Sequence, residues 1–331
     1  MDRPKLRNSP LGGTFFLSLL AGASVLGLMV WFVPPGQLFA VLATGNGSLI
    51  AVACAVSLSS TLLRTYRYLV FFSADDRFAR AYSVFSLSRF LNLAFPFRTG
   101  DLAVLAILKR NRLSPSIAET APVWMVLKAA DALAITIWFS VIVGMSAFAE
   151  RYFAFGAVAV IGALGLMVGL QFAPSLLSGR RRARAGGWVG SRLEALLDGL
   201  EHMGGTVQKF QAIGLSLIIW GMLISTSVLM QTAFSTPLST GDAALVTVLV
   251  LAVSLLPVHA PLGIGTGEAI WVAVMVMIGV PLEEALPLAI AIRLASLGVL
   301  FLEALVGSTV YSLSAPVDDR VVPGQPRRQS G

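Results

Sequence analysis

Six long apolar segments of the chain predict membrane-spanning helices. They cover residues 14–33, 48–72, 120–149, 153–172, 212–234 and 286–313. A helix needs about 20 apolar residues to cross a hydrocarbon core of about 30 Å, so each segment is long enough. The first exceeds the apolar core of a signal peptide, about 7 to 15 residues, which favours a retained helix. It ends at Pro34-Pro35-Gly36, and an uncharged connection is expected from there to residue 48.

Two other apolar regions are broken in the middle and predict re-entrant helical hairpins. The first, residues 82–108, is interrupted by Arg98 and Asp101 and by the helix breakers Pro96 and Gly100. The second consists of residues 243–257 and 269–280, which flank a polar break. Pieces of about 12 residues are too short to cross a bilayer, so each pair is expected to enter and leave on one side.

The two breaks match each other and predict an internal repeat. Thr99-Gly100-Asp101 recurs as Thr266-Gly267-Glu268 at a constant offset (266 − 99 = 167), and Ala118 and Ala285 keep that offset. After a slip by two positions, Lys128-x-x-Asp131 falls opposite Arg293-x-x-Ser296 (293 − 128 = 165). We expect one membrane domain, residues 1–313. It contains one repeat over residues 48–149, a second over 211–313 and a basic connector over 178–210, and a disordered tail, 314–331, follows it.

The charge distribution orients these elements. Most of the 24 lysines and arginines flank the predicted cytoplasmic ends of the spans, which favours cytoplasmic N- and C-termini. In that topology the first hairpin enters from the cytoplasm and the second from outside. The predicted fold class is therefore an all-α polytopic membrane protein with six transmembrane helices and two re-entrant hairpins in inverted repeats, an arrangement common in transporters.

Composition supports the membrane assignment and narrows the function classes. Apolar residues make up 56% of the sequence and charged residues 12%, far from the roughly 25% charged residues of soluble domains. The net charge of +7 resides in clusters beside apolar segments, which favours a membrane surface, here the plasma membrane, over nucleic acid as the partner. The single cysteine, Cys54, excludes a disulfide framework within one chain.

Eight charged residues fall inside the predicted membrane elements. The cations are Arg89, Arg98, Lys128 and Arg293, and the anions are Asp101, Asp131, Glu268 and Glu303. Each charge at bilayer depth costs roughly 2.5 to 3.5 kcal/mol, so pairing is expected. Asp131 lies three residues after Lys128 and is expected to pair with it locally. Arg64 and Arg67, near the end of a span, are instead expected to extend toward lipid headgroups.

Two interpretations of these charges stay open. They can form internal ion pairs that hold broken helices together, or Arg98 and Arg293, with Lys128, can bind the phosphate of a headgroup, aided by helix N-termini near the breaks. The candidate headgroup-binding residues are Arg98, Thr99, Asp101, Lys128, Asp131, Thr266, Glu268 and Arg293. The sequence has no Walker loop and no His/Cys cluster with metal-ligand spacing, so neither a cofactor nor a metal is expected.

The motifs around the breaks resemble those of a known family. They are Asn92-Leu93-Ala94-Phe95-Pro96-Phe97-Arg98-Thr99-Gly100-Asp101, then Lys128-x-x-Asp131, then Pro261-Leu262-Gly263-Ile264-Gly265-Thr266-Gly267-Glu268 with Gly279-Val280-Pro281 and Arg293. Across residues 48–313 the sequence resembles the membrane domain of lysylphosphatidylglycerol synthase/flippase proteins. It departs from the family pattern at Asp101, where the family has Glu, and at Leu127-Lys128, where it has Glu-Arg.

The resemblance implies a function in lipid movement between leaflets. Stand-alone copies of the domain occur without the soluble aminoacyl-transferase domain, and this sequence is expected to be one. We therefore expect binding and translocation of an anionic phospholipid or a polyprenyl-linked headgroup. The alternatives are a membrane enzyme or accessory subunit acting on lipid-linked sugars or aminoacyl lipids, with Asp101 or Glu268 as acid or base, and a non-catalytic partner of such an enzyme. No catalytic motif is recognised.

Overall fold

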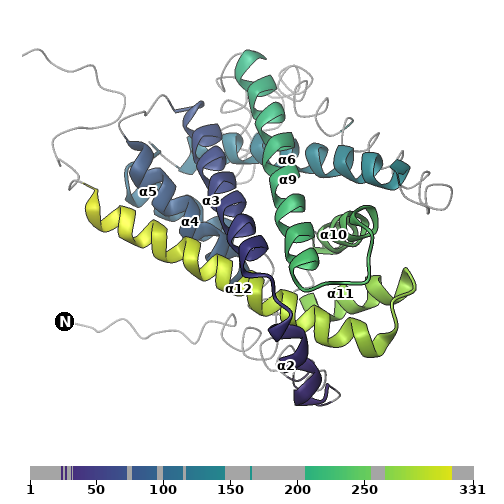
Figure 1. Ribbon diagram of the computed structural model, residues 1–331. Coiled ribbons are helices and arrows are strands. Elements are labelled where there is room, and N and C mark those ends of the chain that lie inside the picture. The colour runs from purple at the N-terminus through teal and green to yellow at the C-terminus, as the bar shows by residue number, and fades with distance from the viewer. Residues whose placement is uncertain are drawn as a thin grey trace, which may run out of the picture.

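The computed structural model describes residues 33–72, 77–94, 100–114, 117–145, 206–254 and 265–314, together with Ser24, Gly27, Trp31 and Gly165. Every regular element in these ranges is a helix (Figure 1). Four of the described helices are long and apolar enough to cross a membrane, namely Gly47–Leu69, Thr120–Met145, Val207–Ala233 and Leu282–Leu313. The chain is therefore an all-α, multi-pass membrane protein, as predicted. Apart from the isolated residues, the predicted spans at 14–33 and 153–172, the basic connector and the tail lie outside the described residues.

The first half contains two spanning helices with a short helical pair between them. The order is α3 (Gly47–Leu69), α4 (Phe78–Ala94), α5 (Gly100–Arg110) and α6 (Ile117–Met145). The Asn46 side chain caps α3 by accepting hydrogen bonds from the N–H groups of Ser48 and Leu49. Arg77, just before α4, donates a hydrogen bond of 2.6 Å to the carbonyl of Arg112, just after α5. The short pair α4–α5 therefore begins and ends at the same place, as a re-entrant hairpin must.

The N-terminal connection differs from the prediction. Residues Pro35–Ala43 form a short helix, α2, where an uncharged connection was expected. Pro35 occupies its first turn, where a missing N–H is no loss because the first N–H groups of a helix have no intrahelical acceptor. The second proline of the pair therefore begins a helix.

The second half repeats the order of the first. It comprises α9 (Thr206–Ala233), α10 (Thr240–Ser254), α11 (Thr266–Met277) and α12 (Leu282–Leu313). Gly279 turns the chain after α11 with a φ of 100°, a conformation that favours glycine. Pro237 before α10 and Glu283 after α11 line one pocket of about 670 Å³, beside Gln37 of α2. The pair α10–α11 thus also starts and returns at one end.

The two halves meet along helices α3 and α9, which pack antiparallel at the centre of the molecule (Figure 1). The N–H of Asn46 before α3 donates to the carbonyl of Ala233 at the end of α9 over 2.9 Å. At the opposite ends, Gln208 of α9 donates to the carbonyl of Val70 after α3 over 3.1 Å. Around this pair, α4 packs against α12 and α10 packs against α6. These two packings of described helices are therefore counterparts of each other with the halves exchanged.

The long helices α6 and α12 share a further feature. Their first residues, Ile117 and Leu282, are related by one offset (282 − 117 = 165), and their internal prolines, Pro122 and Pro287, keep it (287 − 122 = 165). Lys128 and Arg293 are separated by the same offset (293 − 128 = 165). We propose on these grounds that residues 48–149 and 211–313 are inverted repeats.

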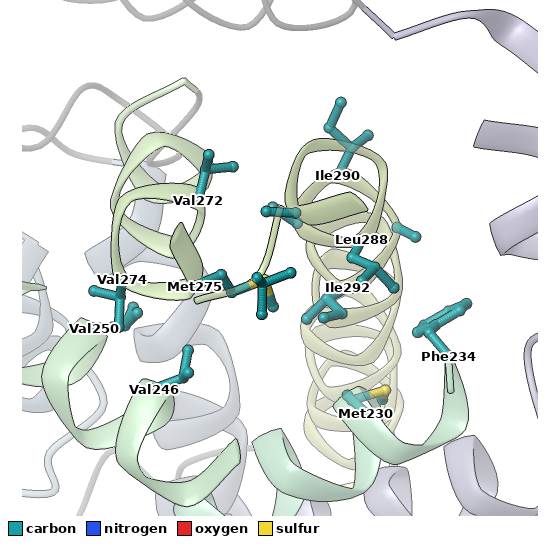
Figure 2. Packing of buried hydrophobic residues seen from close by; sticks show 14 of the residues in the cluster. Met230, Phe234, Val246, Val250, Val272, Val274, Met275, Leu288, Ile290 and Ile292 are labelled. Atoms are coloured by element: carbon teal, nitrogen blue, oxygen red, sulfur yellow. The ribbon is translucent and has the colours of Figure 1, made fainter. Parts of the chain in front are cut away.

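Each hairpin has its own apolar core. In the second half, Met275 of α11 lies between the valines of α10 and the side chains of α12, with Met230 and Phe234 of α9 beyond (Figure 2). In the first half, Tyr68 and Phe85 pack together with ring centroids 5.2 Å apart, beside Leu108 of α5. The charged residues discussed next lie on the same helices that form these two cores.

The hairpin geometry predicts a labelling pattern. In a Cys54→Ala background, cysteines at Pro237 and Glu283 are expected to react with an impermeant thiol reagent from the same side, outside the cell. A cysteine at Asn111, in the turn after α5, should react only after the membrane is opened. Labelling of Pro237→Cys and Glu283→Cys from opposite faces would show that α10 and α11 together cross the membrane.

Candidate functional site

Three ion pairs join the described helices inside the membrane region. They link α3 to α6 through Arg67 and Asp131, α4 to α12 through Arg89 and Glu303, and α11 to α12 through Arg293 and Glu268. The carboxylates of Glu303 and Glu268 are 0% and 2% exposed. Buried charges in such a setting are stable only when they are paired or hydrogen-bonded.

Arg67 is buried in the interior, where the sequence predicted extension toward the headgroups. Its two terminal nitrogens donate to the two oxygens of Asp131, the Nη2–Oδ2 distance being 3.3 Å. Nη1 also donates to the hydroxyl of Ser216 on α9. The expectation for Arg67 is thus wrong, because α3 and α6 both pack against α9, and this packing brings Asp131 and Ser216 to Arg67 as acceptors. Asp131 therefore pairs with Arg67, whereas the sequence predicted a local pair with Lys128.

Arg89 and Glu303 form a second cluster with a serine. Arg89 donates to the Oε1 atom of Glu303 and, over 2.8 Å, to the hydroxyl of Ser57 on α3. Ser57 donates in turn to the same carboxylate oxygen over 2.5 Å. A Cβ atom at Gly307 would lie 2.5 Å from the Cβ of Ser86, so a glycine here permits the close approach of α4 and α12. That approach brings Arg89 within reach of Glu303.

The third pair lies at the second sequence break. Glu268 is in the first turn of α11, which starts after Gly265 with a φ of 77°. Its Oε1 atom lies 3.3 Å from Nε of Arg293 on α12, and its Oε2 atom is buried without a hydrogen-bond partner in the described part of the chain. A Cβ atom at Gly267 would lie 3.8 Å from the guanidinium carbon of Arg293, so the break packs directly against that cation.

The predicted site residues separate into four groups. Glu268 and Arg293 are brought together. Asp131 is paired with Arg67, which also donates to Ser216. Lys128 is exposed, with its ammonium 5.2 Å from the centre of the Trp124 ring. Arg98 and Thr99 lie outside the described residues, as do the side chains of Asp101 on α5 and Thr266 on α11.

Sequence reasoning did not select Arg67, Ser57 or Ser216 as site residues. A signal for the first two was present on α3, where Ser57, Ser60, Arg64 and Arg67 recur at spacings of three and four residues. That spacing places polar groups on one helix face in a span that is otherwise apolar. In the described residues, no group of three or more His, Cys, Asp or Glu side chains could hold a metal ion.

These features define a multi-pass membrane protein whose interior carries charged pairs beside half-length helices. The chain belongs to the family described as the lysylphosphatidylglycerol synthase TM region, whose model matches residues 15–303. No curated protein and no solved structure shows significant similarity to the chain. Membership places the protein in a lipid-related membrane family.

Proposed function

We propose that the protein binds the phosphate-bearing headgroup of an anionic lipid and carries it between the two leaflets. The observation that supports this most is the Arg293–Glu268 pair at the start of α11. Helix α11 has 12 residues and is therefore about 18 Å long, roughly half the bilayer core, so its N-terminus lies well inside the membrane. A largely buried guanidinium beside a helix N-terminus is a favourable environment for a phosphate.

Glu268 gives this site a resting state. Without lipid, the carboxylate neutralises Arg293 and avoids an uncompensated charge in the membrane. An incoming phosphate competes for the same guanidinium, and Glu268 takes the cation back when the phosphate leaves. Because we propose that the two halves are inverted repeats, we also propose that Arg98, Thr99 and Asp101 form an equivalent site at the first break.

The remaining candidates complete the proposed route. Thr266, which begins α11, belongs to the site of Arg293, and Lys128 and Asp131 on α6 line the path of the headgroup. The lipid is an anionic phospholipid or a polyprenyl-linked intermediate of the plasma membrane, and both termini are cytoplasmic. Each of these assignments is part of the proposal.

Replacement of Arg293 by lysine tests the guanidinium site. Lysine keeps the charge but lacks the planar fork that holds two phosphate oxygens, so we expect exchange of labelled lipid in proteoliposomes to slow by about tenfold or more. Arg110→Lys, an exposed change at the end of α5, should leave exchange unchanged. Equal exchange rates for wild type and folded Arg293→Lys would contradict the site.

The Oε2 atom of Glu268 is buried and has no hydrogen-bond partner among the described residues. It therefore also suits a second function, an enzyme on lipid-linked substrates that uses this carboxylate as an acid or base. Product formation in detergent without any leaflet exchange would support that alternative. Activity that appears only with a co-purified membrane protein would instead indicate an accessory role.

A further inference from the structure

Arg64 on α3 lies between two of the ion-pair clusters. It follows Ser57 of the Glu303 cluster by two helical turns and precedes Arg67 by one turn, about 10.5 Å and 4.5 Å along the helix axis. These spacings put the three residues on one face. Arg64 interacts electrostatically with Arg67 and Asp131 at one end and with Arg89 and Glu303 at the other. It is therefore part of the charged interior of the first half.

The two neighbouring carboxylates are already engaged. Asp131 pairs with Arg67, and Glu303 pairs with Arg89, whereas in the described part of the chain no carboxylate lies within ion-pair distance of Arg64. Among the described residues, three guanidinium groups thus face two carboxylates, which leaves one positive charge in excess there. A surplus cation beside two like charges is unfavourable at membrane depth unless an anion joins it.

Free hydrogen-bond donors accompany this excess charge. Nε of Arg67 is buried without an acceptor among the described residues. Trp220 interacts with Asp131, and its buried indole N–H has no acceptor within hydrogen-bond distance among the described residues. Glu303 Oε2 is an unpartnered acceptor in the same part of the described chain. The site can therefore donate to oxyanions and accept one hydrogen bond from a hydroxyl or ammonium group.

We infer that Arg64, with Arg67 and Arg89, forms a second binding site for the phosphate of a lipid headgroup. Arg64 is partly exposed, so a ligand can reach it, and it lies five residues from the end of α3, about 8 Å. That end adjoins the first hairpin's entry side. The site therefore accepts a lipid from the leaflet on that side, before or after the headgroup visits Arg293. The inference takes its ligand class from the proposed function.

Binding to the full chain in detergent tests this site. Short-chain phosphatidylglycerol is expected to raise the melting temperature of the wild type, and Arg64→Gln should weaken its binding by about tenfold or more, the loss of one charge-assisted contact. Inorganic phosphate is expected to give little effect. An equal effect of phosphate, lost in Arg64→Gln, would assign the site to a soluble anion.

The stability of the unliganded variant separates binding from a structural role. Arg64→Gln removes a charge that faces two like charges, so its unliganded melting temperature should equal or exceed that of the wild type. Arg64→Lys should bind with intermediate affinity. Arg110→Gln, an exposed loss of one charge, is the matched control and should bind normally.

Two further results would overturn the inference. One is unchanged lipid affinity in Arg64→Gln, which would leave Arg64 as a side chain that merely extends toward the headgroups. The other is a variant that unfolds or melts well below the wild type, which would make Arg64 a structural cation. Neither result bears on leaflet exchange, so the proposed function is judged separately by the exchange assay on Arg293.

Discussion

Replacing Glu303 by glutamine is expected to destabilise the protein by about 3 to 5 kcal/mol, the typical cost of removing one partner of a buried ion pair. Glu303 is fully buried and accepts hydrogen bonds from Arg89 and Ser57. Glutamine has nearly the same shape, so the packing of α12 on α4 is preserved. The loss therefore reports the uncompensated charge left on Arg89. Unfolding in detergent, followed by circular dichroism, measures it.

A double change identifies the cause of that loss. Arg89→Met combined with Glu303→Met removes both charges and keeps similar volume, so most of the stability is expected to return. Glu284→Gln, in the exposed first turn of the same helix, should change stability by less than about 1 kcal/mol. If Glu303→Gln and Glu284→Gln melted alike, the Arg89–Glu303 pair would have no structural role.

The lengths of apolar segments were sufficient to predict the described helices other than α2. The span predicted over residues 48–72 is a helix over Gly47–Leu69. The last span starts four residues earlier than its apolar run, at Leu282, because Pro281 precedes it and Glu283 and Glu284 occupy its first turn. Acidic residues there are favourable to the helix dipole but interrupt a hydropathy pattern. Helix ends were therefore less predictable than helix positions.

The partners of the buried charges could not be predicted in the same way. Lys128 and Asp131 are neighbours on one helix, so a local pair was the simplest expectation, yet Asp131 accepts two hydrogen bonds from Arg67, 64 residues earlier. That choice depends on which helices pack together, and α3 packs against α9 and α9 against α6. A single sequence contains no information on such contacts beyond the match between its halves.

The match between the halves was informative at the two polar breaks that interrupt the apolar hairpin regions. The repeated Thr-Gly-acid motif singled out Glu268, and the shifted offset singled out Arg293. The structure brings these two residues together at 3.3 Å. Two residues chosen by internal similarity alone thus form one ion pair, which is why the second break remains the centre of the proposed function.

Glu268→Gln is expected to tighten resting lipid binding and to slow lipid exchange by about tenfold or more. Binding tightens because the phosphate no longer competes with a carboxylate for Arg293. Exchange slows because release of the headgroup then leaves a bare cation in the membrane. Bound lipid per protein and exchange in proteoliposomes measure the two effects. Asp101→Asn, at the matching position of the first break, is expected to behave alike.

A purely structural pair gives the opposite pattern. If Glu268 only held α11 against α12, glutamine would leave Arg293 uncompensated, and stability would fall by roughly 3 to 5 kcal/mol with no gain in bound lipid. Glu283→Gln, exposed at the start of α12, is the control for loss of a carboxylate without loss of a pair.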